Sequence, residues 1–180
     1  TAFFFNDEQA NFSRFQHIGL QRTTDTFRKV TDSAAGATAF SIGEKTYTRA
    51  IGVDSDSVAQ ETILERLQEE GYQTGLISLT TITHATPAAF YAHVKDRDQH
   101  EDIAAQLTEA GVDFFAGGGR RYFDKRSDGQ NLFATLQEKG YHLDTSALSK
   151  PNFDSPNAFL LADESLPSKV AGRADYLPQA

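Results

Sequence analysis

Cysteine is absent from the 180-residue sequence. A chain without cysteine can form neither a disulfide framework nor a thiolate metal site, and the absence says nothing about the redox compartment. A single domain of this length can bury about 70% of the surface that its unfolded chain exposes. We therefore expect one domain over residues 1–180 that folds without covalent cross-links.

A basic surface and long apolar runs are missing too. The formal net charge is −8, so we expect no nucleic-acid partner. No segment approaches the roughly 20 apolar residues of a membrane-spanning helix, so we expect no membrane span. The letters AFFF at residues 2–5 are too few for a signal peptide and have no basic flank.

Three segments repeat one order of features, in which a helical pattern is followed by a glycine and then by a β-rich run. They are ILERLQEEGYQTGLISL (63–79), IAAQLTEAGVDFFAGGG (103–119) and LFATLQEKGYHLD (132–144). Gly71, Gly111 and Gly140 stand where a helix ends in a left-handed residue.

The β-rich runs are apolar on both faces, as in a buried parallel sheet, and AFLLA (158–162) adds a further strand. The pattern predicts an α/β domain with a mostly parallel sheet and helices on both faces. In such folds, sites form where strands end and helices begin. Residues 52–57, 117–131 and 149–157 are predicted loops.

The first such junction is VTDSAAGATAF, at residues 30–40. Asp32 and Ser33 both suit the N-cap of a helix, and the small residues after them allow close packing. A capped, buried helix is one interpretation. In the other, Ser33 is a nucleophile, because a helix N-terminus favours phosphate and an ionised oxygen. No histidine lies nearby in sequence to activate it, but a metal could replace that base.

The second junction is THATPAAFYAHVKDRD, at residues 83–98. Thr86 before Pro87 suits an N-cap followed by the first helical position. Arg97 is either a solvated charge or a clamp for phosphate, which arginine's planar fork can grip at two oxygens. His84 could be an ordinary loop histidine. The spacing of Asp96 and His100 matches a metal-ligand pair, but we interpret it as coincidence.

Both junctions resemble the alkaline phosphatase family. Residues 30–38 resemble its active-site signature, an aliphatic residue, any residue, Asp-Ser, four small residues and Thr, and THATPAAFYAHVKDR resembles its second block. The separations also agree, with 53 residues from Ser33 to Thr86 and eleven more to Arg97. The resemblance extends from about residue 15 to about residue 166. It implies a phosphate monoester hydrolase with an α/β three-layer sandwich.

The resemblance assigns a role to each residue. Ser33 is implied as the nucleophile that becomes phosphoserine and binds zinc, and Arg97 as the group that grips two phosphate oxygens. Asp32 is implied to orient Arg97. Thr86 is implied as a ligand of the third metal, usually magnesium, and His84 lies where the family has Asp or His near that ion. The implied cofactors are two zinc ions and one magnesium, and His84 leaves the third metal open.

Further metal ligands of the family do not stand out in this sequence. The five histidines are at positions 17, 84, 93, 100 and 142, and none fits the family's remaining ligand positions. We expect a fragment of a longer phosphatase domain that carries the nucleophile half of the site, has no appreciable activity alone and lacks its metals. Open sheet edges favour self-association, or a homodimer.

Two alternatives remain. Another hydrolase of the alkaline phosphatase superfamily is one, and a non-catalytic phosphate- or partner-binding module is the other. In the module, GGGRR (117–121) would cradle an anion through its backbone N–H groups, whereas a β-turn with two surface arginines is the plainer interpretation. The implied substrates are small phosphomonoesters, and the family resemblance implies a periplasmic or secreted protein.

Overall fold

The computed structural model describes residues 14–17, 19–152, 154–173 and 176. The AFFF letters at residues 2–5 lie outside the described part. The helices are α2 (Ser33–Ile42), α3 (Ile63–Glu69), α4 (Ala85–Ala88), α5 (His100–Glu109), α6 (Arg121–Asp124), α7 (Leu132–Glu138) and the π-helical turn η2 (Lys169–Arg173). The strands are β1 (Gly75–Thr81), β2 (Phe114–Gly118), β3 (His142–Asp144) and β4 (Asn157–Leu160).

The four strands form one sheet in the order β1-β2-β4-β3, and every neighbouring pair is parallel. Gly75 aligns with Phe114, and Phe114 aligns with Asn157 on the next strand. The strands therefore begin at one end of the sheet and end together at the other. The predicted α/β fold with a parallel sheet is confirmed.

Three helices end as their glycines predicted. Gly71, Gly111 and Gly140 directly follow the C-caps of α3, α5 and α7. Their φ angles are 81°, 64° and 83°, in the left-handed region that glycine adopts without a Cβ clash. Each glycine turns the chain from its helix toward the next strand.

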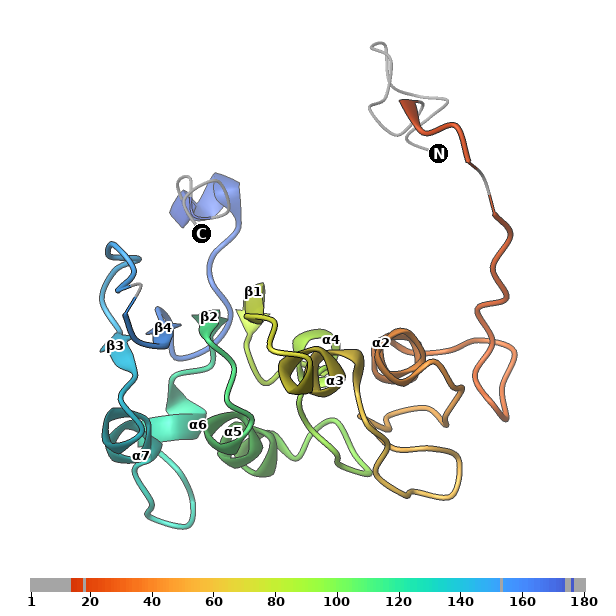
Figure 1. The fold of residues 1–180 in the computed structure, drawn as a ribbon, viewed down its shortest axis with the longest axis horizontal. Coiled ribbons are helices and arrows are strands. Elements are labelled where there is room, and N and C mark those ends of the chain that lie inside the picture. The colour runs from red at the N-terminus through yellow and green to blue at the C-terminus, as the bar shows by residue number, and fades with distance from the viewer. Residues whose placement is uncertain (1–13, 18, 153, 174–175, 177–180) are drawn as a thin grey trace.

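The two faces of the sheet are covered differently. Figure 1 shows α5, α6 and α7 on one side, where Phe115, Leu160 and Leu107 join the main core. On the other side, Phe159 packs with Tyr176 and with partly buried apolar residues of the irregular segments, and η2 lies beyond them. Helices α5, α6 and α7 thus cover one face, and η2 with irregular segments lies on the other.

Two details differ from the expectations. The predicted loop 117–131 contains the short helix α6, whose Phe123 is fully buried. Burial of the Phe123 side chain stabilises this short helix, which the polar residues around it do not predict. The strand predicted at residues 158–162 also differs, because β4 runs from Asn157 to Leu160. Within the described residues, no helix is both long and apolar enough to cross a bilayer.

Candidate functional site

The N-terminus of α2 is built as the junction sequence predicted. Asp32 is the N-cap, and its Oδ1 accepts a hydrogen bond of 3.0 Å from the backbone N–H of Ala35. Ser33 is the first helical residue and is exposed, so its hydroxyl lies beside the free N–H groups of the first turn. The helix ends at Gly43, which has a φ of 74°.

The small residues of α2 pack against the second junction. Ala34 and Ala37 belong to the same core cluster as Ala85 and Ala88 of α4. Side chains of this size let α2 and α4 approach closely, and this contact brings the start of α2 beside the chain that follows β1. The two interpretations of VTDSAAGATAF are therefore compatible, because the same helix is capped, closely packed and open at its N-terminus.

Arg97 reaches both residues of the first junction. Its Nη1 donates hydrogen bonds to Ser33 Oγ at 2.7 Å and to Asp32 Oδ2 at 3.1 Å. The side chain of Arg97 is 19% exposed and that of Asp32 is 23% exposed. The carboxylate of Asp32 therefore holds the Arg97 guanidinium in place, while the same guanidinium nitrogen donates to the exposed Ser33 oxygen.

Hydrogen bonds determine the charge state of Asp32. Burial raises the pKa of its carboxyl, but hydrogen bonds from the backbone N–H groups of Ala35 and Arg49 and from Arg97 outweigh that effect. The pKa consequently lies below its usual value, and Asp32 is ionised at neutral pH. A carboxylate in this state accepts a charge-assisted bond from Arg97.

His84 receives a hydrogen bond from the other end of the same guanidinium. Arg97 Nη2 lies 3.2 Å from His84 Nε2, and since the arginine can only donate, this nitrogen accepts without a proton. Burial and the positive charges of Arg97 and His100 lower the pKa of His84. A neutral imidazole therefore lies beside Arg97, at the N-cap of α4.

The predicted N-cap role of Thr86 is wrong. The N-cap of α4 is His84, and Thr86 is the second helical residue, with Pro87 after it. The reason is where the chain leaves the sheet: β1 ends at Thr81, the three residues 82–84 form a turn, and the helix begins at Ala85, before Thr86. The Thr86 side chain is exposed and its hydroxyl makes no hydrogen bond within the described part of the chain, so the oxygen is available to a ligand.

Comparisons with known proteins agree with this geometry. The chain matches the alkaline phosphatase family over residues 1–178. The chain belongs to the alkaline phosphatase family. It is 39% identical over 165 residues to alkaline phosphatase 3 of Bacillus subtilis (strain 168). The aligned region covers 86% of this chain and 35% of that protein.

The fold matches solved alkaline phosphatases as well. The enzyme from the Antarctic bacterium TAB5 superimposes with a TM-score of 0.92 at 43% identity, covering 99% of this chain and 53% of that chain. A TAB5 variant with one histidine replaced by aspartate, solved with Mg bound in its M3 site, matches equally well. This chain thus spans about a third of the curated Bacillus relative and about half of the solved one.

The glycine-rich segment of this family member does not form an anion cradle. The backbone N–H groups of Gly119 and Arg120 donate to the carbonyl oxygens of Glu164 and Ala162, at 3.0 and 2.9 Å. The side chains of Arg120 and Arg121 form ion pairs with Asp163 and Glu164. These two backbone donors and both arginine side chains bind the 162–164 segment, so they do not form the anion cradle of the alternative interpretation.

Asp96 and His100 do not share a site. Asp96 forms an ion pair with Arg49, while His100 stacks on Tyr122 with ring centroids 4.5 Å apart and contacts Thr83 through Nδ1. Their spacing is coincidental, as expected. Across the described ranges, no group of three or more His, Asp and Glu side chains could hold a metal ion. Ser33 and Thr86 offer single hydroxyl oxygens, which do not make a zinc site.

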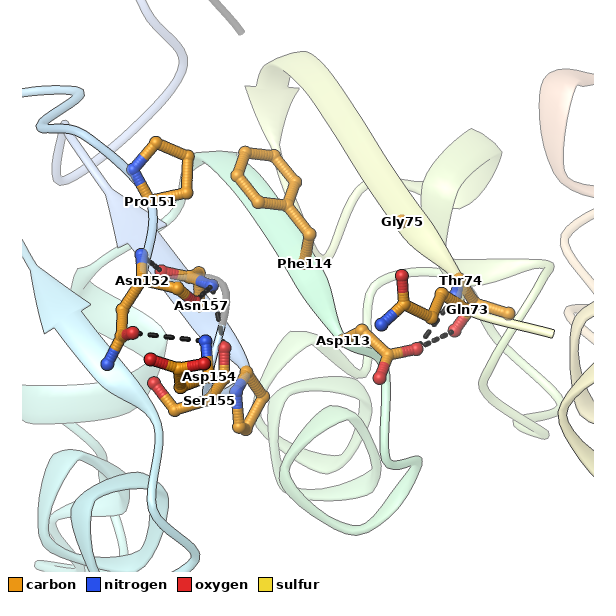
Figure 2. Close-up of a pocket in the computed structure, with 11 residues that line it drawn as sticks. Gln73, Thr74, Gly75, Asp113, Phe114, Pro151, Asn152, Asp154, Ser155 and Asn157 are labelled. Carbon is orange, nitrogen blue, oxygen red and sulfur yellow. Dashed lines mark hydrogen bonds between the residues drawn. The ribbon is translucent and has the colours of Figure 1, made fainter. Parts of the chain in front are cut away.

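A cavity of about 660 Å³, drawn in Figure 2, is lined by none of the candidate site residues. It is lined by residues at the starts of β1, β2 and β4, at the end of the sheet opposite Ser33. Asp113 accepts a 2.7 Å hydrogen bond from the backbone N–H of Thr74, and Asn157 bonds the backbone of Asn152 in both directions. These polar groups bond one another and fix the strand starts, so we assign the cavity no chemistry.

Sequence reasoning missed Arg49. Its backbone N–H lies 3.3 Å from Asp32 Oδ1, and its side chain pairs with Asp96 beside Arg97. Nothing in the sequence around Arg49 indicates this, because the contact depends on how the loop after α2 folds back over the helix start.

Proposed function

We propose that this chain carries the nucleophile and the phosphate-binding arginine of a metal-dependent phosphomonoesterase. The observation that carries the proposal is the 2.7 Å contact between Arg97 and an exposed Ser33 at the start of α2. A phosphoryl group on Ser33 Oγ would lie within reach of Arg97 and of the first N–H groups of the helix. Membership of the alkaline phosphatase family supports the same reaction.

The chemistry is a transfer in two steps. Ser33 Oγ attacks phosphorus as the bond to the alcohol oxygen breaks, and the hydroxyl proton ends on the released alcohol. Water then attacks phosphorus, which frees inorganic phosphate and restores the Ser33 hydroxyl. Arg97 stabilises the charge that spreads over the phosphoryl oxygens, while Asp32 keeps the guanidinium in position.

The metal requirement remains a proposal. Family membership and the Mg-bound TAB5 variant support metal cofactors, and we propose two zinc ions and a third ion near Thr86 and His84. The described residues do not fit such a site alone, because no cluster of three ligands occurs among them. We propose that the remaining ligands belong to polypeptide beyond this chain, and we derive no step through a metal.

The proposal is tested first on the chain itself. Inorganic phosphate should bind the 180-residue chain weakly, and Arg97→Ala should weaken that binding by about tenfold or more, the value of a charged hydrogen bond. The chain should not turn over an aryl phosphate with zinc and magnesium added. Metal-dependent turnover that Ser33→Ala abolishes would contradict the expected inactivity and support the nucleophile.

The rival enzyme class is tested on the full-length protein. A phosphomonoesterase hydrolyses monoesters far faster than diesters, because binding is concentrated on the phosphoryl group. Trapped phosphate on Ser33, located by mass spectrometry after an acid quench, would support the covalent intermediate. Preference for a diester would favour another member of the superfamily.

Partners and location are proposed on the same basis. Small phosphomonoesters are the proposed substrates, and family resemblance supports a periplasmic or secreted protein. The exposed strand β1 supports self-association or a homodimer, since Ile77 on that strand is 47% exposed. Fractionation of the source cells and sedimentation of the purified chain test these two statements.

A further inference from the structure

Arg49 has an unusual backbone for a residue with a side chain. Its φ is 79°, and among the described residues only Ser57, with a φ of 66°, shares this non-glycine feature. A left-handed conformation is unfavourable for residues with a Cβ, and such strain gathers at functional sites. Arg49 is exposed in the loop between α2 and α3, so burial of its side chain does not explain the conformation.

The strained backbone connects the two sides of the candidate site. The N–H of Arg49 donates to Asp32 Oδ1 at 3.3 Å, and its carbonyl accepts from the N–H of Arg97 at 2.9 Å. One peptide segment therefore contacts the residue that caps the nucleophile helix and the residue that binds phosphate.

The Arg49 side chain binds the two acidic residues that flank Arg97 in sequence, Asp96 and Asp98. Arg49 Nε and Nη2 donate to Asp96 at 2.9 and 2.7 Å, and Nη2 also contacts Asp98. The hydrogen bonds from Arg49 and from the backbone N–H of Asp98 lower the pKa of Asp96 to about 2, so this carboxyl is ionised. Without a partner, two carboxylates adjacent to Arg97 would compete for its guanidinium and repel a phosphate anion.

We propose that Arg49 is a positioning residue for phosphate binding: it keeps Asp96 and Asp98 away from Arg97 and fixes the backbone between Arg97 and Asp32. This inference rests on the proposed function of Ser33 and Arg97. The Arg49–Asp96 ion pair is exposed, and such a pair usually contributes little to the free energy of unfolding. We therefore assign Arg49 a role in the geometry of Arg97.

The test uses a variant that separates the side chain from the backbone. Arg49→Gly keeps the left-handed conformation and both backbone hydrogen bonds but removes the guanidinium. Inorganic phosphate, titrated by calorimetry, should bind about fivefold more weakly, within the range of coupling between neighbouring groups. Arg49→Lys keeps the charge without the planar fork and should recover part of the affinity. Ser57→Gly, which relaxes the other left-handed residue, should leave binding unchanged.

A second measurement does not depend on phosphate. In the wild-type chain both terminal nitrogens of Arg97 are hydrogen-bonded, so nitrogen-15 NMR should show slow rotation of its guanidinium. The Arg97→Lys variant has no guanidinium at this position, so the signal it lacks is that of Arg97. In Arg49→Gly the Arg97 guanidinium should rotate fast. Unchanged rotation and unchanged phosphate affinity in folded Arg49→Gly would overturn the inference. If Arg97→Ala itself leaves phosphate binding intact, the proposed function fails, and the NMR result still decides the role of Arg49.

Discussion

The Arg97 guanidinium lies 2.7 Å from the Ser33 hydroxyl, although 64 positions separate the two residues in sequence. In this arrangement the serine oxygen accepts a hydrogen bond from the same group that would grip a phosphoryl group attached to it. The donor is therefore organised before a substrate arrives, which avoids reorganisation at the moment of reaction.

Asp32 has two roles that substitution can separate. Asp32→Asn keeps an N-cap oxygen for Ala35 but loses the charge that holds Arg97. Phosphate affinity should fall about fivefold, the loss of about 1 kcal/mol, with little change in the free energy of unfolding. Asp32→Ala should lose the same affinity and also about 1 kcal/mol of stability.

Calorimetric phosphate titration and urea unfolding of these two variants provide the measurements. Equal losses of stability in Asp32→Asn and Asp32→Ala would contradict a separable capping role. Full phosphate affinity in Asp32→Asn would show that Arg97 does not need the Asp32 charge.

A pH-dependent contribution to stability is expected at Glu65. Burial raises the pKa of its carboxyl, but the N–H of Thr62 and the ring of His93 lower it more, so the folded value lies below the ordinary 4.5. Because the folded pKa is depressed, the stabilisation is present above pH 4.5 and is lost as pH falls through the folded value.

Glu65→Gln retains the capping-box geometry but not the charge beside His93, which lies 2.9 Å away. We expect the variant to lose about 1 kcal/mol of stability at pH 7 and to converge on the wild type once the pH falls below the folded pKa of Glu65. Urea unfolding across this range measures the difference. A constant difference at every pH would show that the Glu65 charge does not contribute.

Two glycines should respond to alanine in opposite directions. Gly36 lies inside α2, and a Cβ there would meet only Thr31 Cγ2 at 3.8 Å, so Gly36→Ala should stabilise by about 0.5–1 kcal/mol. A Cβ on Gly118 would lie 1.9 Å from the carbonyl oxygen of Glu164, so Gly118→Ala should destabilise by about 3 kcal/mol. Thermal unfolding of both variants measures these changes. An unchanged melting temperature for Gly118→Ala would mean that the 162–164 segment shifts to accommodate the added Cβ.

Self-association should depend on the exposed strand β1. The strand pairs only with β2 among the described residues, so its other edge can pair with a second chain. Ile77→Lys should weaken association by roughly tenfold, because the edge then carries a charge in place of an apolar side chain. Sedimentation velocity measures this, with Val58→Lys, at an exposed position outside the sheet, as the control. Equal effects of the two substitutions would assign association to general surface charge.

Local sequence determined much of the fold. The glycines after α3, α5 and α7, the apolar strands and the Asp32 cap all act over a few residues, so their patterns are legible without the tertiary structure. The N-cap of α4 was predicted wrongly because Thr86 suits a cap by residue type, whereas the exit from β1 starts the helix at Ala85 and leaves His84 at the cap position without a side-chain cap bond. The short helix α6 depends on the buried Phe123.

By itself, the sequence determined an α/β chain that places a serine and an acid at the start of a helix, together with its likeness to the alkaline phosphatase family. Only the tertiary structure decided that Arg97 reaches Ser33 and that Arg49 connects Asp32 to the Arg97 segment. The physical reason is the separation in sequence between the residues that make each contact. A cap is made by neighbours along one helix, whereas these contacts exist because small side chains let α2 and α4 pack closely and bring distant loops together.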